Sequence, residues 1–214
     1  MQRIRDRNDI ERGLDWLAER DEALLRARER VEAVAPVPLR LDRPGFAPMV
    51  EVVCTQQISR ASAAAIHDRL LREVGDPTPG AIMTLDDDAM RRIGLSRPKF
   101  VTLRALADAV HDGLDLETVC DLPTDDAFQA LCNVRGIGPW TAGVYLMFFG
   151  GHPDIMPSAD VALQWSASDI DGLSERMNAK ELEARARIWS PWRSVAARLL
   201  WANYALRKDR PVLP

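Results

Sequence analysis

A glycine-rich turn is the part of this sequence whose residue types and spacing are best suited to chemistry. Gly136-Ile137-Gly138-Pro139 comes directly after an apolar helical pattern. The glycines permit a tight turn, and Pro139 suits the first turn of a new helix. A helix, a hairpin and a second helix in this order direct backbone N–H groups and a helix N-terminus outward, which favours anion binding. The candidate donors to a nucleic-acid phosphate are the backbone N–H groups of Gly136, Gly138 and Thr141.

A lone carboxylate follows the turn in the sequence Pro157-Ser158-Ala159-Asp160, which leads into another apolar helical run. Taken by itself, an aspartate at this position is most simply a helix N-cap. A hairpin that holds a phosphate would instead bring the next helix start against the same backbone, near a sugar. A carboxylate there stabilises developing positive charge and orients or deprotonates an attacking water. Asp160 is therefore the predicted catalytic residue.

Several separate blocks resemble one family of proteins. They are the hairpin string from residue 131 to 142, the sequence ending at Asp160, the block Gln56-Gln57-Ile58-Ser59, and Trp-Ser-Pro-Trp-Arg-Ser at residues 189–194. Together they resemble the helix-hairpin-helix DNA glycosylases with a glycine-proline-aspartate motif (HhH-GPD), and most closely the DNA-3-methyladenine glycosylase II family. The resemblance runs from about residue 50 to residue 201.

The resemblance implies a fold and an activity. The fold is all-α, with two helical lobes and a cleft between them. The activity is that of a base excision repair enzyme, which flips an alkylated base out of double-stranded DNA and hydrolyses its N-glycosidic bond. The substrates implied are bases of the 3-methyladenine and 7-methylguanine type, and the product is an abasic site.

The resemblance also assigns roles to particular residues. The second glutamine of the pair, Gln57, is the expected DNA wedge, with Ile58 beside it, and fills the gap that an extruded nucleotide leaves. Trp140 and Trp201 match aromatic positions of the base pocket, where an indole face attracts a cationic alkylated purine. A pocket tyrosine of some members falls at Val144 here, and Tyr145 is adjacent to it.

Two further implications concern the hairpin. Glycosylases that also cut the backbone carry a Schiff-base lysine at the position of Trp140, so this chain is predicted to be monofunctional. In relatives the hairpin carbonyls bind a monovalent cation, which implies a possible Na⁺ or K⁺ site at the carbonyls of Cys132, Val134 and Ile137. No metal bound by side chains and no other cofactor are expected.

Composition adds bounds on where and how the protein acts. The 214-residue chain has a net charge of −4, so bulk charge does not recruit DNA and local geometry must do so. No apolar run reaches membrane-spanning length. Three scattered cysteines and the lack of a secretory signal predict a reduced, cytoplasmic protein. No cysteine follows Cys132, which excludes the four-cysteine iron–sulfur cluster of some relatives. A monomer without membrane association is expected.

Helical periodicity and breakers predict an all-α chain that forms one compact unit in three stretches. Residues 1–46 form an N-terminal helical arm, residues 47–123 a first lobe with the wedge, and residues 124–214 a lobe with the hairpin, Asp160 and the last helix. Arg97 and Lys99 precede a helix, where they either meet phosphate or lie on a solvated face.

The same residues are compatible with other functions. The chain is alternatively a helix-hairpin-helix DNA-binding protein without catalysis, a glycosylase for deaminated or oxidised bases, or a helical enzyme unrelated to nucleic acid.

Overall fold

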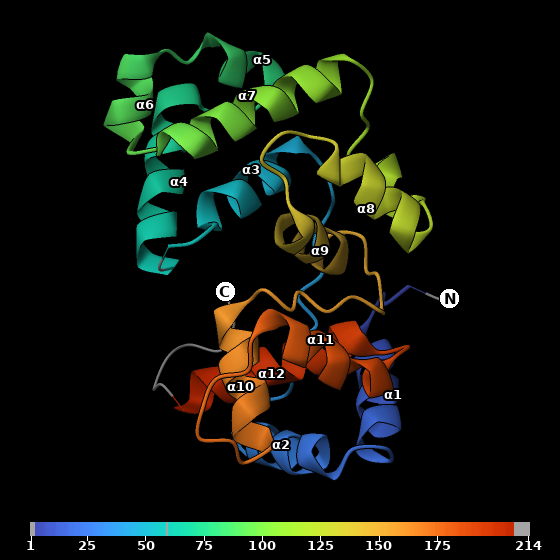
Figure 1. The fold of residues 1–214 in the computed structure, drawn as a ribbon. Helices are drawn as coiled ribbons and strands as arrows, with labels where there is room; N and C mark the ends of the chain where they lie inside the picture. Colours follow the sequence, from blue (N-terminus) through green and yellow to red (C-terminus); the bar gives the residue numbers. More distant parts are fainter. Residues whose placement is uncertain (1–2, 59, 208–214) are drawn as a thin grey trace. The chain divides into compact units, whose positions relative to one another are not determined.

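The computed structural model describes residues 3–58 and 60–207, and all regular elements in this part of the chain are helices (Figure 1). The predicted all-α fold is therefore confirmed. None of the described helices is long and apolar enough to cross a lipid bilayer. Backbone contacts divide the chain into two compact units, which are residues 1–41 with 151–214 (unit 1) and residues 42–150 (unit 2).

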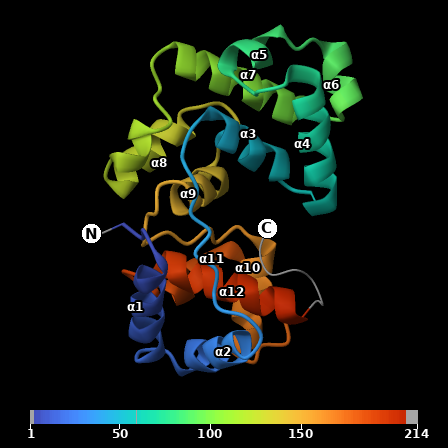
Figure 2. The same cartoon turned by 180° about the vertical axis from the view of Figure 1, so that it is seen from behind.

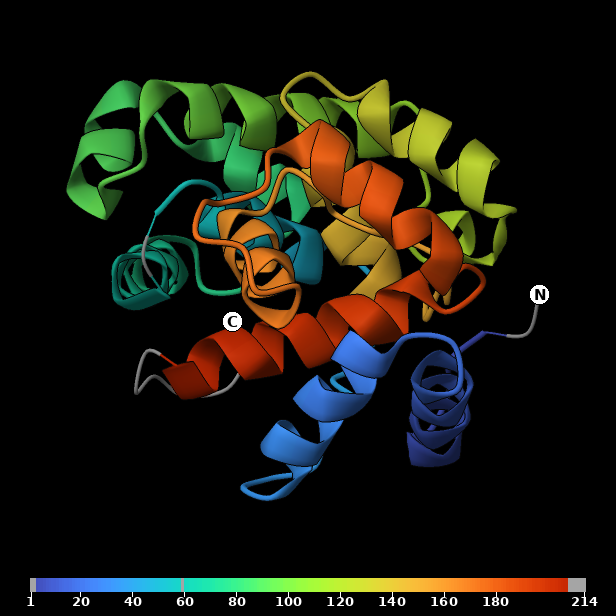
Figure 3. The same cartoon turned by 60° about the horizontal axis from the view of Figure 1, so that its bottom comes forward.

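Unit 1 joins the two ends of the chain around one long buried helix. Its helices are α1 (Arg7–Ala18), α2 (Glu22–Glu32), α10 (Val161–Ile170), α11 (Ala179–Arg185), η2 (Ala186–Trp189) and α12 (Arg193–Arg207). Helix α12 is buried along most of its length and packs against α1, α2 and α10 (Figure 3). The crossing with α1 is close, because a side chain at Gly13 would overlap Trp192 and Val195.

The predicted N-terminal helical arm consists of two helices, α1 and α2. Asp6 and Asp9 form a capping box at the start of α1. The side chain of Asp21 then accepts hydrogen bonds from the N–H groups of Ala23 and Leu24 and begins α2. The sequence pattern alone did not show this break, since apolar residues recur at helical spacing on both sides of Asp21.

A fully buried arginine binds the segment between α2 and α3 to α12. Arg198 donates through Nε to the carbonyl of Leu39 at 3.0 Å and through Nη1 to the carbonyl of Ser194 at 3.1 Å. Burial lowers the pKa of this guanidinium to about 9, so it remains charged at neutral pH.

Unit 2 is one continuous stretch of chain. Its helices are α3 (Phe46–Thr55), α4 (Arg60–Val74), α5 (Pro79–Thr84), α6 (Asp87–Ile93), α7 (Arg97–His111), η1 (Thr118–Asp121), α8 (Thr124–Cys132) and α9 (Pro139–Phe148). The apolar helix α3 contacts α4, α7 and α9, while α5 packs on α7 and α8 on α9 (Figure 2). Helix α9 is buried from Thr141 to its end, so the hairpin that begins it stands on a packed core.

The division of the chain differs from the one predicted at residue 123. The hairpin and α9 belong to unit 2 with residues 42–123, whereas Asp160 and the last helix belong to unit 1 with the N-terminal helices. The physical reason is the packing of α9 on α3 and of α12 on α1 and α2. Linear sequence order does not show these long-range pairings.

Candidate functional site

The predicted hairpin is present between α8 and α9. Asn133 ends α8, and the N–H of Ile137 donates to the carbonyl of Val134 at 3.0 Å, which closes the turn. Gly136 has φ +88°, in the left-handed region that favours glycine, and a Cβ at this position would overlap the side chain of Thr102 on α7. Glycine is therefore required here by backbone conformation and by packing.

Several backbone N–H groups of the hairpin and of the first turn of α9 make no hydrogen bond within the described part of the chain. They include the three donors predicted from sequence, at Gly136, Gly138 and Thr141, as well as the N–H of Arg135. Pro139 at the first helical position has no N–H to offer. Unbonded N–H groups at the positive end of a helix attract anions, so the geometry fits a phosphate.

The predicted wedge residues lie in the turn that follows α3, here called the wedge turn (residues 56–58). Gln57 and Ile58 are exposed, and Gln57 has φ +56°, which is unusual for a residue with a Cβ. Ile58 is 39% exposed although it is a large apolar side chain. These features suit insertion into a duplex, and the wedge role itself stays a prediction. Ser59 of the same block lies outside the described residues.

Gln56, which the sequence reasoning passed over, connects the wedge turn to the hairpin. Its Nε2 donates to Oγ1 of Thr141 at 2.7 Å and makes a longer contact of 3.5 Å with the carbonyl of Gly136. The sequence signal was available, because two adjacent glutamines followed an apolar run. The turn and the hairpin thus share a side-chain bridge.

Tyr145 lies inside unit 2, and its place in the base pocket stays a prediction. Its side chain is fully buried in unit 2, and its hydroxyl accepts a hydrogen bond from the N–H of Gly45 at 2.7 Å. The hydroxyl also lies 3.1 Å from the carbonyl of Gly45 and 3.0 Å from that of Leu116, and the ring stacks on Phe149. Burial raises the pKa of the phenol, which therefore stays protonated. Tyr145 holds the start of α3 against α9.

Asp160 is the N-cap of α10. Its Oδ1 accepts hydrogen bonds from the N–H groups of Ala162 at 2.8 Å and Leu163 at 3.1 Å. The side chain is part-buried, and the two cap bonds hold the carboxylate in a fixed orientation. The structural reading as a cap is therefore correct, and it is compatible with a catalytic role because a capped carboxylate is preorganised.

The segment that carries Asp160 is held by the start of α12. Arg193 binds the carboxylate of Asp154 through Nε at 2.7 Å, and Ser194 Oγ accepts from the N–H of Ile155 at 3.0 Å. On the other side, Gln164 donates to the carbonyl of Ser158 at 2.8 Å. The block at residues 189–194 thus positions the loop before Asp160 as well as opening its own helix.

The two tryptophans of the predicted base pocket belong to different units. Trp140 is part-buried at the second position of α9 in unit 2, and Trp201 is 4% exposed on α12 in unit 1. Their shared role in base recognition stays a prediction.

The two basic residues in the first turn of α7 differ in outcome: Arg97 lies on the solvated face, as one of the two expectations had it, whereas Lys99 does not. Arg97 pairs with Asp87 on the surface. Lys99 is buried, with 7% of its surface exposed, and donates to the carbonyl of Cys54 at 2.8 Å. Lys99 lies in the first turn of α7 and contacts the end of α3. The local sequence did not reveal this contact.

Two of the three hairpin carbonyls are open to the cation that the resemblance implies, and the cation site itself stays a prediction. The carbonyls of Cys132 and Ile137 accept no hydrogen bond in the described ranges, and that of Val134 accepts one from Ile137. Carbonyl oxygens are suitable ligands for Na⁺ or K⁺.

Arg135 is a second residue that the sequence reasoning missed. Most arginines of unit 2 are engaged, for example by Asp88 or Glu73, or by a carbonyl as with Arg104. Arg135 is exposed, stands next to Gly136, and has no hydrogen bond or ion pair with the described residues. A basic residue left unpaired in an acidic chain is a local source of positive potential.

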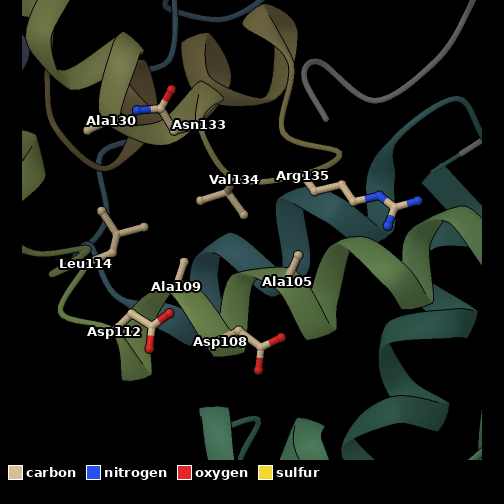
Figure 4. A pocket seen from close by; sticks show the side chains of 9 residues that line it. All are labelled: Ala105, Asp108, Ala109, Asp112, Leu114, Ala130, Asn133, Val134 and Arg135. Carbon is tan, nitrogen blue, oxygen red and sulfur yellow. The ribbon is translucent and has the colours of Figure 1, made fainter.

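The carboxylates in the open groove beside Arg135 do not pair with its guanidinium. The groove encloses about 490 Å³ between α7, α8 and the hairpin. Asp108 and Asp112 lie on its α7 wall, whereas the guanidinium of Arg135 extends away from these carboxylates (Figure 4). The positive charge of Arg135 thus lies beside the hairpin and not beside the α7 carboxylates.

The chain is similar to proteins of known family. The family model described as HhH-GPD superfamily base excision DNA repair protein matches residues 50–193. The chain is 27% identical to the alkylbase DNA glycosidase-like protein mag2 of Schizosaccharomyces pombe, over 80% of this chain and 84% of that protein. It is 28% identical to DNA-3-methyladenine glycosylase 1 of the same organism, over 78% of this chain and 75% of that protein.

A solved structure gives the same result. The S. pombe 3-methyladenine DNA glycosylase Mag1, in complex with abasic DNA, superposes with a TM-score of 0.81 and 25% identity, covering 92% of this chain and 97% of that one. Because the family model spans more than half of the chain, including the hairpin and Asp160, this protein belongs to the HhH-GPD superfamily of base excision DNA repair proteins.

Proposed function

We propose that this protein is a monofunctional DNA glycosylase that removes alkylated bases, of the 3-methyladenine type, from double-stranded DNA. The observation that carries the proposal is the hairpin with its unbonded N–H groups, inside a matched family segment that also contains Asp160. The relatives named above as 3-methyladenine DNA glycosylases support the substrate class. The protein acts as a monomer on DNA in the cytoplasm.

The proposed mechanism begins with binding of the DNA backbone. The N–H groups of Gly136, Gly138 and Thr141 bind a phosphate at the start of α9. Exposed Gln57 and Ile58 enter the duplex and fill the gap left by the extruded nucleotide. A monovalent cation on the hairpin carbonyls would add positive charge beside the same phosphate.

Asp160 supplies the chemistry in this proposal. An N3- or N7-alkylated purine already carries positive charge and leaves readily, so strong acid assistance is not needed. The Asp160 carboxylate stabilises the cationic sugar as the C1′–N bond breaks, and it directs the water that adds to C1′. The helix position that carries a Schiff-base lysine in the lyase subclass is Trp140 here, so the product is an abasic site in an uncut strand.

The test is base release from a duplex methylated with an N-alkylating agent. We expect free 3-methyladenine to appear, and the strand to break only after alkali treatment. Tight binding to abasic-site DNA without release of any base would instead support a DNA-binding module. Release confined to deaminated or oxidised bases in a lesion panel would assign a different substrate class. Strand breakage without alkali would contradict the monofunctional assignment.

Replacing Gly138 with alanine should weaken DNA binding about tenfold. Gly138 has φ −99°, and a Cβ there meets no atom within 4 Å, so alanine fits the protein itself. The methyl group would instead project into the space beside the unbonded N–H groups. Affinity for an abasic-site duplex, measured by fluorescence anisotropy, checks the expectation.

Gly80→Ala is the matched control, because Gly80 also lies near a helix start and has open space at its Cβ. Gly80→Ala should bind like wild type. Equal affinity of the two variants for DNA would show that the DNA backbone does not approach the hairpin at Gly138.

Replacing Arg135 with glutamine should reduce the salt dependence of DNA binding. Loss of one phosphate contact lowers the slope of log K against log salt concentration by about 0.9. The measurement is a salt titration of affinity for undamaged duplex. Arg72→Gln removes the same charge from an exposed arginine near the end of α4 that has no ion pair with the described residues, and its slope should equal that of wild type. Identical slopes for both variants would mean that Arg135 contacts no phosphate.

A further inference from the structure

Lys99 is a buried charged residue that the proposed mechanism leaves without a task. It lies in the first turn of α7, and its Nζ donates to the carbonyl of Cys54 at 2.8 Å. Burial lowers the pKa of the ammonium group and raises the pKa of the neighbouring Cys54 thiol to about 11. The thiol is therefore uncharged at neutral pH, and the carbonyl is the partner of Lys99.

That carbonyl belongs to the last turn of α3, where helices leave carbonyl groups without intrahelical partners. The carbonyl of Val52 accepts from the hydroxyl of Thr55 at 2.7 Å, and that of Val53 accepts from the N–H of Gln56 at 3.3 Å. Lys99 satisfies the next one, at Cys54. A cation at a helix C-terminus also interacts favourably with the helix dipole. Lys99 thus caps α3 from a different helix.

The chain leaves α3 directly into the wedge turn, whose conformation is strained. Gln57 has φ +56°, and such conformations persist only where the surroundings enforce them. Among the described residues, two side chains hold this turn in place. Lys99 binds the end of α3 before it, and Gln56 binds Thr141 after the hairpin.

Helix α7 also contacts the hairpin itself. Thr102 lies one turn after Lys99 and packs against Gly136, where a Cβ would overlap its hydroxyl. The first two turns of α7 therefore touch both the end of α3 and the hairpin. The hydrogen bond from Gln56 to Thr141 connects the wedge turn to α9 as well.

We propose that Lys99 is a positioning residue that fixes the wedge turn relative to the phosphate-binding hairpin, so that gripping the strand and filling the duplex occur in one rigid unit. The inference rests on the proposed wedge function. Removing the ammonium group should leave phosphate binding largely intact while the wedge residues lose their fixed direction. The variant should therefore keep its affinity for DNA and insert its wedge residues less well.

The test uses the full-length protein and a duplex that contains a tetrahydrofuran abasic analogue with 2-aminopurine next to it. Wedge insertion changes the stacking, and hence the fluorescence, of the 2-aminopurine. With saturating Lys99→Met, the fluorescence change on this duplex should fall to less than about half of the wild-type value. Single-turnover base release, measured separately on methylated duplex, should slow about tenfold. Affinity for undamaged duplex should stay within about threefold of wild type. Lys99→Arg, which keeps the charge and the donors, should recover most of the fluorescence change.

Arg69→Met is the matched control. Arg69 caps another helix in the same way, since its Nε donates to the carbonyl of Ile93 at the end of α6 at 2.6 Å. This variant loses a comparable cationic cap without touching the wedge turn. Lys99→Met and Arg69→Met giving the same fluorescence change would show that Lys99 is merely structural, and the inference would fail.

The outcomes also separate this inference from the proposed function. Wild type that changes the 2-aminopurine fluorescence but releases no base refutes the glycosylase proposal, and the Lys99 comparison still decides the inference. Wild type that leaves the fluorescence unchanged refutes the wedge and the inference with it. Where Lys99→Met does not fold, Gln56→Leu breaks the other tie of the wedge turn, and a full wild-type fluorescence change in that variant overturns the inference.

Discussion

Asp160→Asn is expected to slow base release from methylated DNA by about 100-fold or more, while the protein stays folded. The amide oxygen of asparagine still accepts the hydrogen bonds from Ala162 and Leu163, and asparagine is as good an N-cap as aspartate. The substitution removes only the negative charge that the proposed mechanism places against the cationic sugar. Single-turnover kinetics on methylated duplex measure the loss, and thermal unfolding verifies the fold.

The matched control for this substitution is Asp86→Asn. Asp86 is the N-cap of α6, and its side chain accepts from the N–H of Ala89 at 2.7 Å. The same charge is lost from the same structural position on another helix, so base release should match wild type. Equal rates for wild type and Asp160→Asn would reduce Asp160 to a cap and remove the catalytic part of the proposal. Affinity of Asp160→Asn for abasic-site DNA should remain close to wild type.

Gly136→Ala is expected to lower the free energy of unfolding by about 2–4 kcal/mol. Alanine at φ +88° adopts an unfavourable left-handed conformation, and its methyl group overlaps the side chain of Thr102. The hairpin must then distort, so DNA affinity should fall together with stability. Urea unfolding monitored by circular dichroism gives the first quantity, and anisotropy with duplex DNA gives the second.

A double variant separates the two causes of this loss. Thr102→Ala removes the overlapping hydroxyl and should restore part of the stability of Gly136→Ala, whereas the left-handed backbone strain and the 2.9 Å approach to the Cβ of residue 102 remain. No recovery in the double variant would mean that these two remaining causes account for the whole effect. A Gly136→Ala protein as stable as wild type would contradict the tight turn described here.

The sequence was most informative where one local rule decides the structure. Gly136 and Pro139 predict the hairpin because the first needs a left-handed conformation and the second begins a helix. Asp160 was predicted at a helix start, and it lies there. The all-α fold followed from helical periodicity throughout the chain. Each of these inferences depends on residues close together in sequence.

The sequence failed where a side chain acts across the fold. Lys99 seemed to be a surface cation, but the packing of α7 on α3 buries it against the carbonyl of Cys54. The sequence also did not show that the hydroxyl of Tyr145 binds the backbone of Gly45, 100 positions away along the chain. Gln56 was overlooked because its partner, Thr141, is 85 positions away. Periodicity carries no information about such contacts.

The chain order of the two units has a consequence for how the protein is made. Unit 2 is inserted between the two parts of unit 1, and its ends meet where the N–H of Asp42 donates to the carbonyl of Phe148 at 2.9 Å. A ribosome therefore releases α1 and α2 long before it releases α12, the helix on which they pack. Unit 2 is fully synthesised before α12. While unit 2 folds during synthesis, the apolar faces of α1 and α2 that pack on α12 remain uncovered. These two helices are the segment that we expect chaperones to bind on the nascent chain.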